Sequence, residues 1–219
     1  MRIVSGRFDA DKEVYHVQGG KKLRLSRPQQ LMAAEREIIE EAYAGDIIGV
    51  FDPGIFSIGD TLCAPGKKFR FDPIPTFAPE HFKRVRSLDT MKRKQFLKGM
   101  EQIAQEGAIQ IFKTPYTGME EVIVGVVGTL QFDVLEYRLK NEYNVELYME
   151  GLPYEYLRWI ETDDGEPVKE EDLILGTDVK LVEDYKGNQL LLFGSQWAIG
   201  WTEERNKNLT FHEFGGTKF

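Results

Sequence analysis

The 219-residue sequence predicts an α+β fold in two parts, the first rich in strands and the second mixed. Short apolar segments separated by glycine and aspartate turns fill the first third of the chain, as in small barrels. Prolines at 73, 75 and 79 then interrupt this pattern. Beyond them, strand-like and helix-like segments alternate. This change of period separates the two parts.

Two hairpins are predicted at the N-terminus. Residues 2–6 and 14–17 are strand-like and are joined by a turn-rich segment at 9–12, which predicts the first hairpin. Residues 14–17 then continue through Gln18-Gly19-Gly20 into 21–25. Because paired glycines supply the positive φ of a tight turn, this segment predicts the second hairpin.

Residues 33–43 leave two alternatives. Their alanines, glutamates and arginine favour a helix on propensity alone. Their neighbours favour strands, because a turn at 43–46 leads into an apolar strand at 47–50, and another strand follows at 55–62 after Asp52-Pro53-Gly54. Short strands at this spacing predict a barrel over residues 1–72.

The proline-rich residues 73–80 predict a linker to a second domain at 81–219. Residues 82–88 alternate apolar and basic side chains, as a strand does. Residues 91–106 carry apolar side chains at helical spacing, and Gly107 ends that helix. Residues 109–112 form the next strand.

Residues 120–147 predict one further β-α-β unit. A strand rich in β-branched residues at 121–128 ends at a glycine, and Thr129 is a candidate N-cap for the helix that follows. The apolar residues expected near one face of this helix are Leu130, Val134, Leu135, Tyr137 and Leu139. Residues 145–149 then alternate as a strand. The order is β-α-β-β-α-β, the split arrangement of ferredoxin-like domains.

Charge is distributed unevenly along the chain. The formal net charge is -8, but residues 1–30 hold seven Lys and Arg against three Asp and Glu, and residues 81–113 hold eight against three. Residues 150–219 hold seven against fifteen, so this end repels phosphate. A polyanion is therefore expected to meet the chain only at two limited patches.

Catalysis has little support in the sequence. His16, His81 and His212 lie far apart and form no metal motif. Neither Gly20-Lys21-Lys22 nor Gly66-Lys67-Lys68 completes a phosphate-binding loop, although D-x-x-G occurs twice. We therefore predict no catalytic residue, metal or cofactor in this chain. The absence of a long apolar run and the single cysteine, Cys63, suit a cytoplasmic protein.

Two motifs in order give the first family resemblance. Residues 37–49, which contain E-A-Y-A-G-D-I, are followed by I-G-D-T-L at 58–62. Together they resemble the second domain of the translational GTPases, a β-barrel. The resemblance implies that Met1 lies within the opening strands of a truncated barrel, so that the chain is a fragment.

Three further segments are more specific. Residues 75–82, 95–100 and 128–134, supported by 143–146, resemble the third domain of bacterial class II peptide chain release factors. The resemblance extends to about residue 159 and is looser at 161–219, although 209–212 resemble the closing strand of that domain. Residues 197–201 contain two tryptophans, which we expect to pack in the core or against a neighbouring domain.

The resemblance implies a parent protein whose N-terminal GTPase domain drives dissociation of class I release factors from the ribosome. GTP, GDP and magnesium are expected only in that domain. The implied partners are rRNA and small-subunit proteins, class I release factors indirectly, and the GTPase domain itself, with no membrane. The alternatives are an RNA-binding module unrelated to GTPases and, third, an enzyme.

Candidate ribosome-binding residues follow from the two basic patches. From charge alone, rRNA binding and a merely solvated face are equally favoured, and the resemblance favours binding. The stronger candidates are Lys83, Arg84, Arg86, Lys92, Arg93 and Lys94. The weaker ones, around the second hairpin, are Lys21, Lys22, Arg24 and Arg27.

Overall fold

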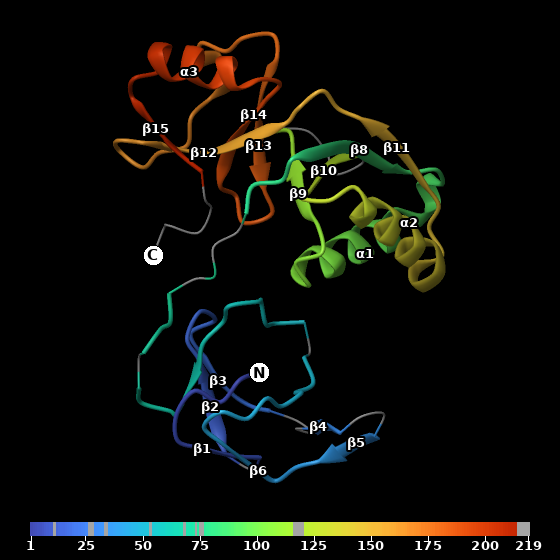
Figure 1. The fold of residues 1–219 in the computed structure, drawn as a ribbon, viewed down its shortest axis with the longest axis vertical. Coiled ribbons are helices and arrows are strands. Elements are labelled where there is room, and N and C mark those ends of the chain that lie inside the picture. The colour runs from blue at the N-terminus through green and yellow to red at the C-terminus, as the bar shows by residue number, and fades with distance from the viewer. Residues whose placement is uncertain are drawn as a thin grey trace. The chain divides into compact units, whose positions relative to one another are not determined.

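The structure is a computed structural model that describes residues 1–10, 12–25, 29–32, 35–52, 54–67, 69–72, 74, 77–115 and 121–213. The chain forms two compact units, unit 1 at Met1–Ile74 and unit 2 at Pro75–Phe219 (Figure 1). Strands predominate in both, and the described α-helices all belong to unit 2. The predicted α+β class is confirmed. Part of the predicted linker, at residues 73, 75 and 76, lies outside the described residues.

Unit 1 consists of short antiparallel strands. They are β1 (Arg7–Asp9), β2 (Glu13–His16), β3 (Lys21–Arg24), β4 (Gln29–Met32), β5 (Glu35–Ile38), β6 (Glu41–Tyr43) and β7 (Leu62–Cys63). Strand β2 lies between β3 and β7, β1 pairs with β6, and β4 pairs with β5. One cluster of buried side chains holds these pieces together, formed by Ile3, Phe8, Leu25, Ala42 and Ile48.

The second predicted hairpin is confirmed, because β2 and β3 pair around Gly20, whose φ is +63°. The strand alternative for residues 33–43 is confirmed within the described part by β5 and β6. The first predicted hairpin is wrong. Gly6, at φ +77°, turns the chain so that Arg2 bridges to Ile47 and β1 pairs with β6.

The strands predicted at 47–50 and 55–62 are also wrong over most of their length. Within the described residues, single bridges at Ile47 and Gly49 and the start of β7 at Leu62 remain. Side-chain oxygens of Asp52 and Asp60 take up the backbone N–H groups here and bend the chain into turns.

Unit 2 is built on one antiparallel sheet with the order β11-β8-β10-β9-β13-β14-β12-β15. Its strands are β8 (His81–Ser87), β9 (Gln110–Lys113), β10 (Glu121–Val126), β11 (Leu147–Gly151), β12 (Tyr156–Thr162), β13 (Val179–Asp184), β14 (Gln189–Phe193) and β15 (Leu209–His212). Its helices are the 3-10 turns η1 (Thr90–Lys92) and η2 (Glu170–Asp172) and the α-helices α1 (Arg93–Gln105), α2 (Leu130–Tyr143) and α3 (Gln196–Arg205). Strand β15 forms where the closing strand was expected.

The sheet curls back on itself and creates four layers. Helices α1 and α2 cover one face of the first four strands, where Val85, Phe96 and Leu139 are buried together (Figure 1). On the other face of these strands, Phe82 and Phe112 pack with Leu190 and other residues of the second half of the sheet. Helix α3 covers the outer face of that second half. Alternate residues of β14 therefore enter different cores.

The set of residues that α2 buries differs from the prediction. Leu135 and Leu139 are buried as expected, but Leu130, Val134 and Tyr137 are exposed. The buried face instead contains Phe132, at i, i+3 and i+7 with the two leucines, because α2 packs against both α1 and the sheet. The five predicted residues thus lie on two faces of the helix.

The predicted N-cap of α2 is confirmed in position but not in its side-chain bond. Thr129 precedes the helix but makes no side-chain capping hydrogen bond. Gln131 Oε1 accepts from the backbone N–H groups of Val127 and Gly128, both at 3.0 Å, which occupies the donors at the bend between β10 and α2. At the other end, Asn144 adopts the left-handed conformation at φ 55° and terminates the helix.

Candidate functional site

The basic side chains of β8 divide between the two faces of the sheet. Lys83 lies on the helix-covered face, with its Nζ 4.4 Å from the ring centre of Phe132. Arg84 and Arg86, an even number of residues from Phe82, share the opposite face with it. The structure therefore separates Lys83 from the two arginines.

Two residues of β11 complete the surface around these arginines. Arg86 pairs in register with Tyr148, and its guanidinium carbon lies 4.7 Å from the centre of the tyrosine ring. Arg84 pairs with Glu150, and their side chains are 3.5 Å apart. We call Arg84, Arg86, Tyr148 and Glu150 the arginine face. Strand β8 lies between β10 and the edge strand β11, so this surface is the broad face of the two outermost strands at one end of the sheet.

The arginine face lies at one end of the sheet. The second half of the sheet does not cover this end, so the arginine face is open to solvent. Tyr148 is 45% exposed, and the side chains of Arg84 and Glu150 are 41% and 50% exposed. Tyr154 borders it, and partial burial raises the pKa of its hydroxyl, although the charge of Arg84 acts in the opposite direction. An exposed ion pair such as Arg84–Glu150 contributes little to stability.

The basic residues after β8 form a projecting corner at the start of α1. Arg93 and Lys94 are exposed and Lys92 is half-buried. Asp89 holds the turn, since its Oδ1 accepts from the backbone N–H of Met91 at 2.9 Å. The exposed apolar side chains of Leu88 and Met91 flank these bases. We call residues 88–94 the basic corner.

The weaker predicted patch lies in unit 1, on the outer strand of the β3-β2-β7 sheet. Lys21, Lys22 and Arg24 are all exposed on β3. The fourth predicted member, Arg27, lies outside the described residues. Because the two units are not placed relative to each other, this patch and the arginine face stay separate candidates.

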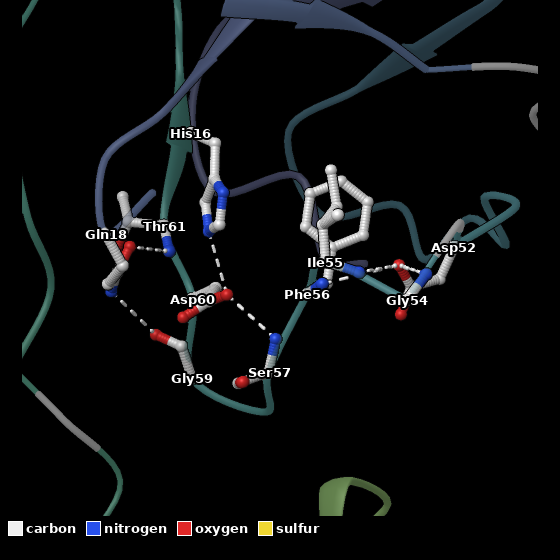
Figure 2. A network of polar contacts seen from close by, with 10 residues as sticks. All are labelled: His16, Gln18, Asp52, Gly54, Ile55, Phe56, Ser57, Gly59, Asp60 and Thr61. Carbon is white, nitrogen blue, oxygen red and sulfur yellow. Dashed lines mark hydrogen bonds and ion pairs between the residues drawn. The ribbon is translucent and has the colours of Figure 1, made fainter. Parts of the chain in front are cut away.

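A buried polar network in unit 1 is structural (Figure 2). Asp60 Oδ2 accepts from the backbone N–H of Ser57 and from His16 Nε2, both at 2.8 Å. Gln18 bonds to the neighbouring backbone, accepting from the N–H of Thr61 at 2.8 Å. His16 Nδ1 has no partner among the described residues, and a Cβ on Gly19 would lie 2.4 Å from it. The ring therefore fills its space and leaves none for a ligand.

The described residues hold no group of three or more His, Cys, Asp or Glu side chains arranged for a metal ion. The same residues include no helix long and apolar enough to cross a membrane. The strongest charge cluster is Arg138 between Glu106 and Glu142, where two hydrogen-bonded carboxylates raise the pKa of the guanidinium. It ties α2 to the end of α1 and is a structural contact.

Two aromatic features were missed or misjudged at the sequence level. Tyr148 was seen only as part of a strand, and its place beside Arg86 depends on strand register, which no local pattern contains. Trp197 was expected to pack in the core or against a neighbouring domain, yet 72% of it is exposed in unit 2. Its expected core role is wrong, and the alternative, packing against a neighbouring domain, stays a prediction.

Comparison with known proteins first defines a class. Residues 1–65 match the family model described as elongation factor G domain 2, which makes the chain part of a translation factor. Residues 71–203 match the model described as class II release factor RF3, C-terminal domain. The chain belongs to the class II release factor RF3 family, as its sequence motifs indicated.

Curated relatives named peptide chain release factor 3 agree with this assignment. That of Symbiobacterium thermophilum is 52% identical over 211 residues, which are 96% of this chain and 39% of the relative. Those of Gloeobacter violaceus and Listeria monocytogenes are 44% and 43% identical, over 97% and 95% of this chain and 40% and 39% of their own lengths. The chain thus spans about two-fifths of the length of these relatives.

Proposed function

We propose that this chain docks a peptide chain release factor on the ribosome through the arginine face and the basic corner. The observation that carries the proposal is the Arg86–Tyr148 pair beside Arg84 on an open sheet face. Guanidinium groups bind phosphate oxygens, and an exposed ring stacks on an unpaired base. Together they suit single-stranded or irregular rRNA.

The basic corner would add phosphate contacts from a second direction. Lys92, Arg93 and Lys94 follow the end of β8, so they continue from the same strand as the two arginines. Lys83, on the other face, would contribute to the general field of the unit. Lys21, Lys22, Arg24 and Arg27 remain proposed contacts for the first domain.

We further propose a translation-factor barrel at 1–72, a linker at 73–80 and an elaborated ferredoxin-like domain at 81–219. The order β11-β8-β10-β9, with α1 and α2 on one face, supports the ferredoxin-like assignment. The match of residues 1–65 to elongation factor G domain 2 supports the barrel.

For the whole protein, we propose GTP-dependent dissociation of class I release factors in translation termination, in the cytoplasm. Small-subunit proteins, class I release factors and a GTPase domain are its proposed partners. GTP and magnesium would bind that GTPase domain. This chain would supply docking surfaces, and their orientation would follow the nucleotide state.

Co-sedimentation with purified, salt-washed ribosomes at several salt concentrations tests the docking role. For the wild type, we expect the logarithm of the binding constant to fall linearly with the logarithm of the salt concentration. The double variant Arg84→Glu, Arg86→Glu should bind more weakly and reduce the salt slope by about 1.4, as for two contacts to single-stranded phosphate.

The matched control reverses two exposed lysines in the acidic part of unit 2, Lys169→Glu and Lys186→Glu. It changes the net charge equally but should retain near wild-type binding. Equal loss in both double variants would show that only net charge matters. Failure of the wild-type chain to sediment with ribosomes would overturn the docking proposal itself.

A further inference from the structure

Helix α3 presents a second surface of different chemistry, at the other end of the sheet from the arginine face (Figure 1). Trp197 is 72% exposed, and its ring centre lies 6.4 Å from that of the half-buried Trp201. The guanidinium carbon of Arg205 lies 4.0 Å from the ring centre of Trp201. We call Trp197, Gly200, Trp201 and Arg205 the tryptophan face.

The helix that carries this face is firmly held. Ser195 Oγ accepts from the backbone N–H of Ala198 at 3.2 Å and caps the start of α3. At its end, the buried Asn206 accepts from the N–H of Ile174 and donates to its carbonyl oxygen, both at 2.9 Å. Ala198 and Ile199 pack into the core beneath. The indoles therefore project from a rigid support, which lowers the entropic cost of binding.

Trp197 belongs to none of the apolar clusters formed by the described residues of unit 2. Tryptophan is highly buried on average, and tryptophan and arginine are enriched at the centres of protein interfaces. Gly200 lies between the two tryptophans in the sequence, and a Cβ there would meet nothing within 4 Å. An apolar side chain of a partner can lie against this open backbone, beside the indoles.

The charge around the tryptophan face selects the partner. Glu203 and Glu204 are exposed on the same helix. Arg205 and Lys207 are exposed beside them, but residues 151–213 as a whole carry fourteen Asp and Glu against six Lys and Arg. Although the indoles are suitable for stacking on a base, this field repels a phosphate backbone and attracts cationic side chains.

We propose that the tryptophan face binds a cationic polypeptide segment that carries at least one large apolar side chain. The segment's apolar side chain packs on Trp197 and Trp201, and its lysines or arginines lie near Glu203 and Glu204. This proposal rests on the proposed function only in placing the segment on the ribosome, where a docked release factor would meet it. The arginine face would bind RNA, so unit 2 would hold two unlike partners.

Fluorescence anisotropy of a labelled synthetic peptide of alternating lysine and leucine tests the proposal without ribosomes. The 219-residue chain should bind this peptide, and Trp197→Ala should weaken binding about tenfold or more. Tyr185→Ala removes a 54% exposed aromatic elsewhere in unit 2 and should leave binding unchanged. Thermal unfolding of each variant checks that the fold is retained.

Two substitutions of opposite charge at position 200 separate the effect of charge from the effect of side-chain size. Gly200→Lys and Gly200→Glu add side chains of similar length into the same open space, but the lysine variant should bind the peptide at least about tenfold more weakly. Equal affinities would overturn the cationic partner. Binding of labelled poly(U) that depends on Trp197, or no peptide binding by the wild type, would overturn the proposal whatever the ribosome assay shows.

Photo-crosslinking identifies the partner where the chain does sediment with ribosomes. A benzoylphenylalanine at position 200 should join to a ribosomal protein within a basic segment, with loss of the product in Trp197→Ala. A crosslink to rRNA, or none despite sedimentation, would overturn the proposal and leave the docking role intact.

Discussion

The two units maintain their folds by different means. Unit 2 buries three apolar clusters around one continuous sheet. Among its described residues, unit 1 buries one cluster of five side chains and leaves large apolar side chains exposed, such as Ile47 at 72%, Phe51 at 64% and Ile58 at 64%. Its corners are instead set by side-chain bonds to turns, at Asp52, Asp60 and Gln18 (Figure 2). Apolar burial specifies the fold of unit 2, while unit 1 depends more on a few polar contacts.

The largest expected effect is on the core between the two halves of the unit 2 sheet. Phe112 is 1% exposed there, so Phe112→Ala should lower the free energy of unfolding by about 3–5 kcal/mol. Phe77→Ala removes a 68% exposed ring from the same unit and should change it by less than about 0.5 kcal/mol. Urea unfolding measures both. Similar values would show that burial does not control this unit.

The next effect tests unit 1. Asp60→Ala leaves Nε2 of the 3% exposed His16 without its carboxylate partner and frees the Ser57 turn. An unpaired buried polar group costs about 1–3 kcal/mol, so the free energy of unfolding of unit 1 should fall by that amount. Amide hydrogen exchange locates the change. The exposed Asp72→Ala serves as control, and an equal loss there would contradict a structural role for the network.

A smaller effect asks whether polar contacts also matter in unit 2. Ser195→Ala removes a side-chain cap from α3 and should cost about 1 kcal/mol in thermal or chemical unfolding. Thr129→Ala precedes α2, where the side chain makes no capping bond, and should be neutral within about 0.5 kcal/mol. A larger cost at Thr129 would mean that the sequence rule describes α2 better than the structure does.

The smallest effect is the response to acid. In unit 2, hydrogen bonds from Arg138 hold the pKa of the Glu142 carboxyl group below its ordinary value. Bonds from Lys12 and then Arg7 do the same for Asp9 in unit 1. A carboxylate with a lowered folded pKa adds stability above its unfolded pKa and loses it as pH falls through the folded value.

Glu142→Gln and Asp9→Asn should therefore each reduce the loss of stability on acidification, which Tm measurements from neutral pH down to about pH 3 would show. Glu136→Gln changes an exposed carboxylate on the same helix as Glu142 and should leave the pH profile as it was. Identical profiles for Glu142→Gln and the wild type would contradict the contribution of this ion pair.

Periodicity and turn residues predicted much of unit 2, because its elements are long and bury one or two faces. Helices α1 and α2 and the β-α-β-β-α-β order follow from such patterns, whereas α3 and strands β12, β13 and β14 were not predicted. The buried face of α2 was partly misassigned, since Leu130 and Phe132 are both apolar and only packing against α1 and the sheet distinguishes them. Unit 1 was harder to predict, because its strands are only two to four residues long and their pairing depends on contacts distant in sequence.

The candidate sites, too, could be predicted from the sequence only in part. The basic residues of β8 were visible in the sequence, and the period of two in a strand already separates Lys83 from Arg84 and Arg86. The stacking of Arg86 on Tyr148 was not visible, because it requires the register of β8 with β11. The exposure of Trp197 was unexpected since aromatic bulk alone favours burial.

The junction between β9 and β13 has a mechanical consequence. Among the described residues, two pairs join the halves of the unit 2 sheet in register: Lys113 with Glu183, whose side chains also form an ion pair at 3.1 Å, and Phe112 with Asp184. Apolar packing, which is non-directional, adds to this connection. Under tension or bending, this short seam would yield before the longer ladders on either side. Unit 2 is thus jointed near its middle, with the arginine face on one arm and the tryptophan face on the other.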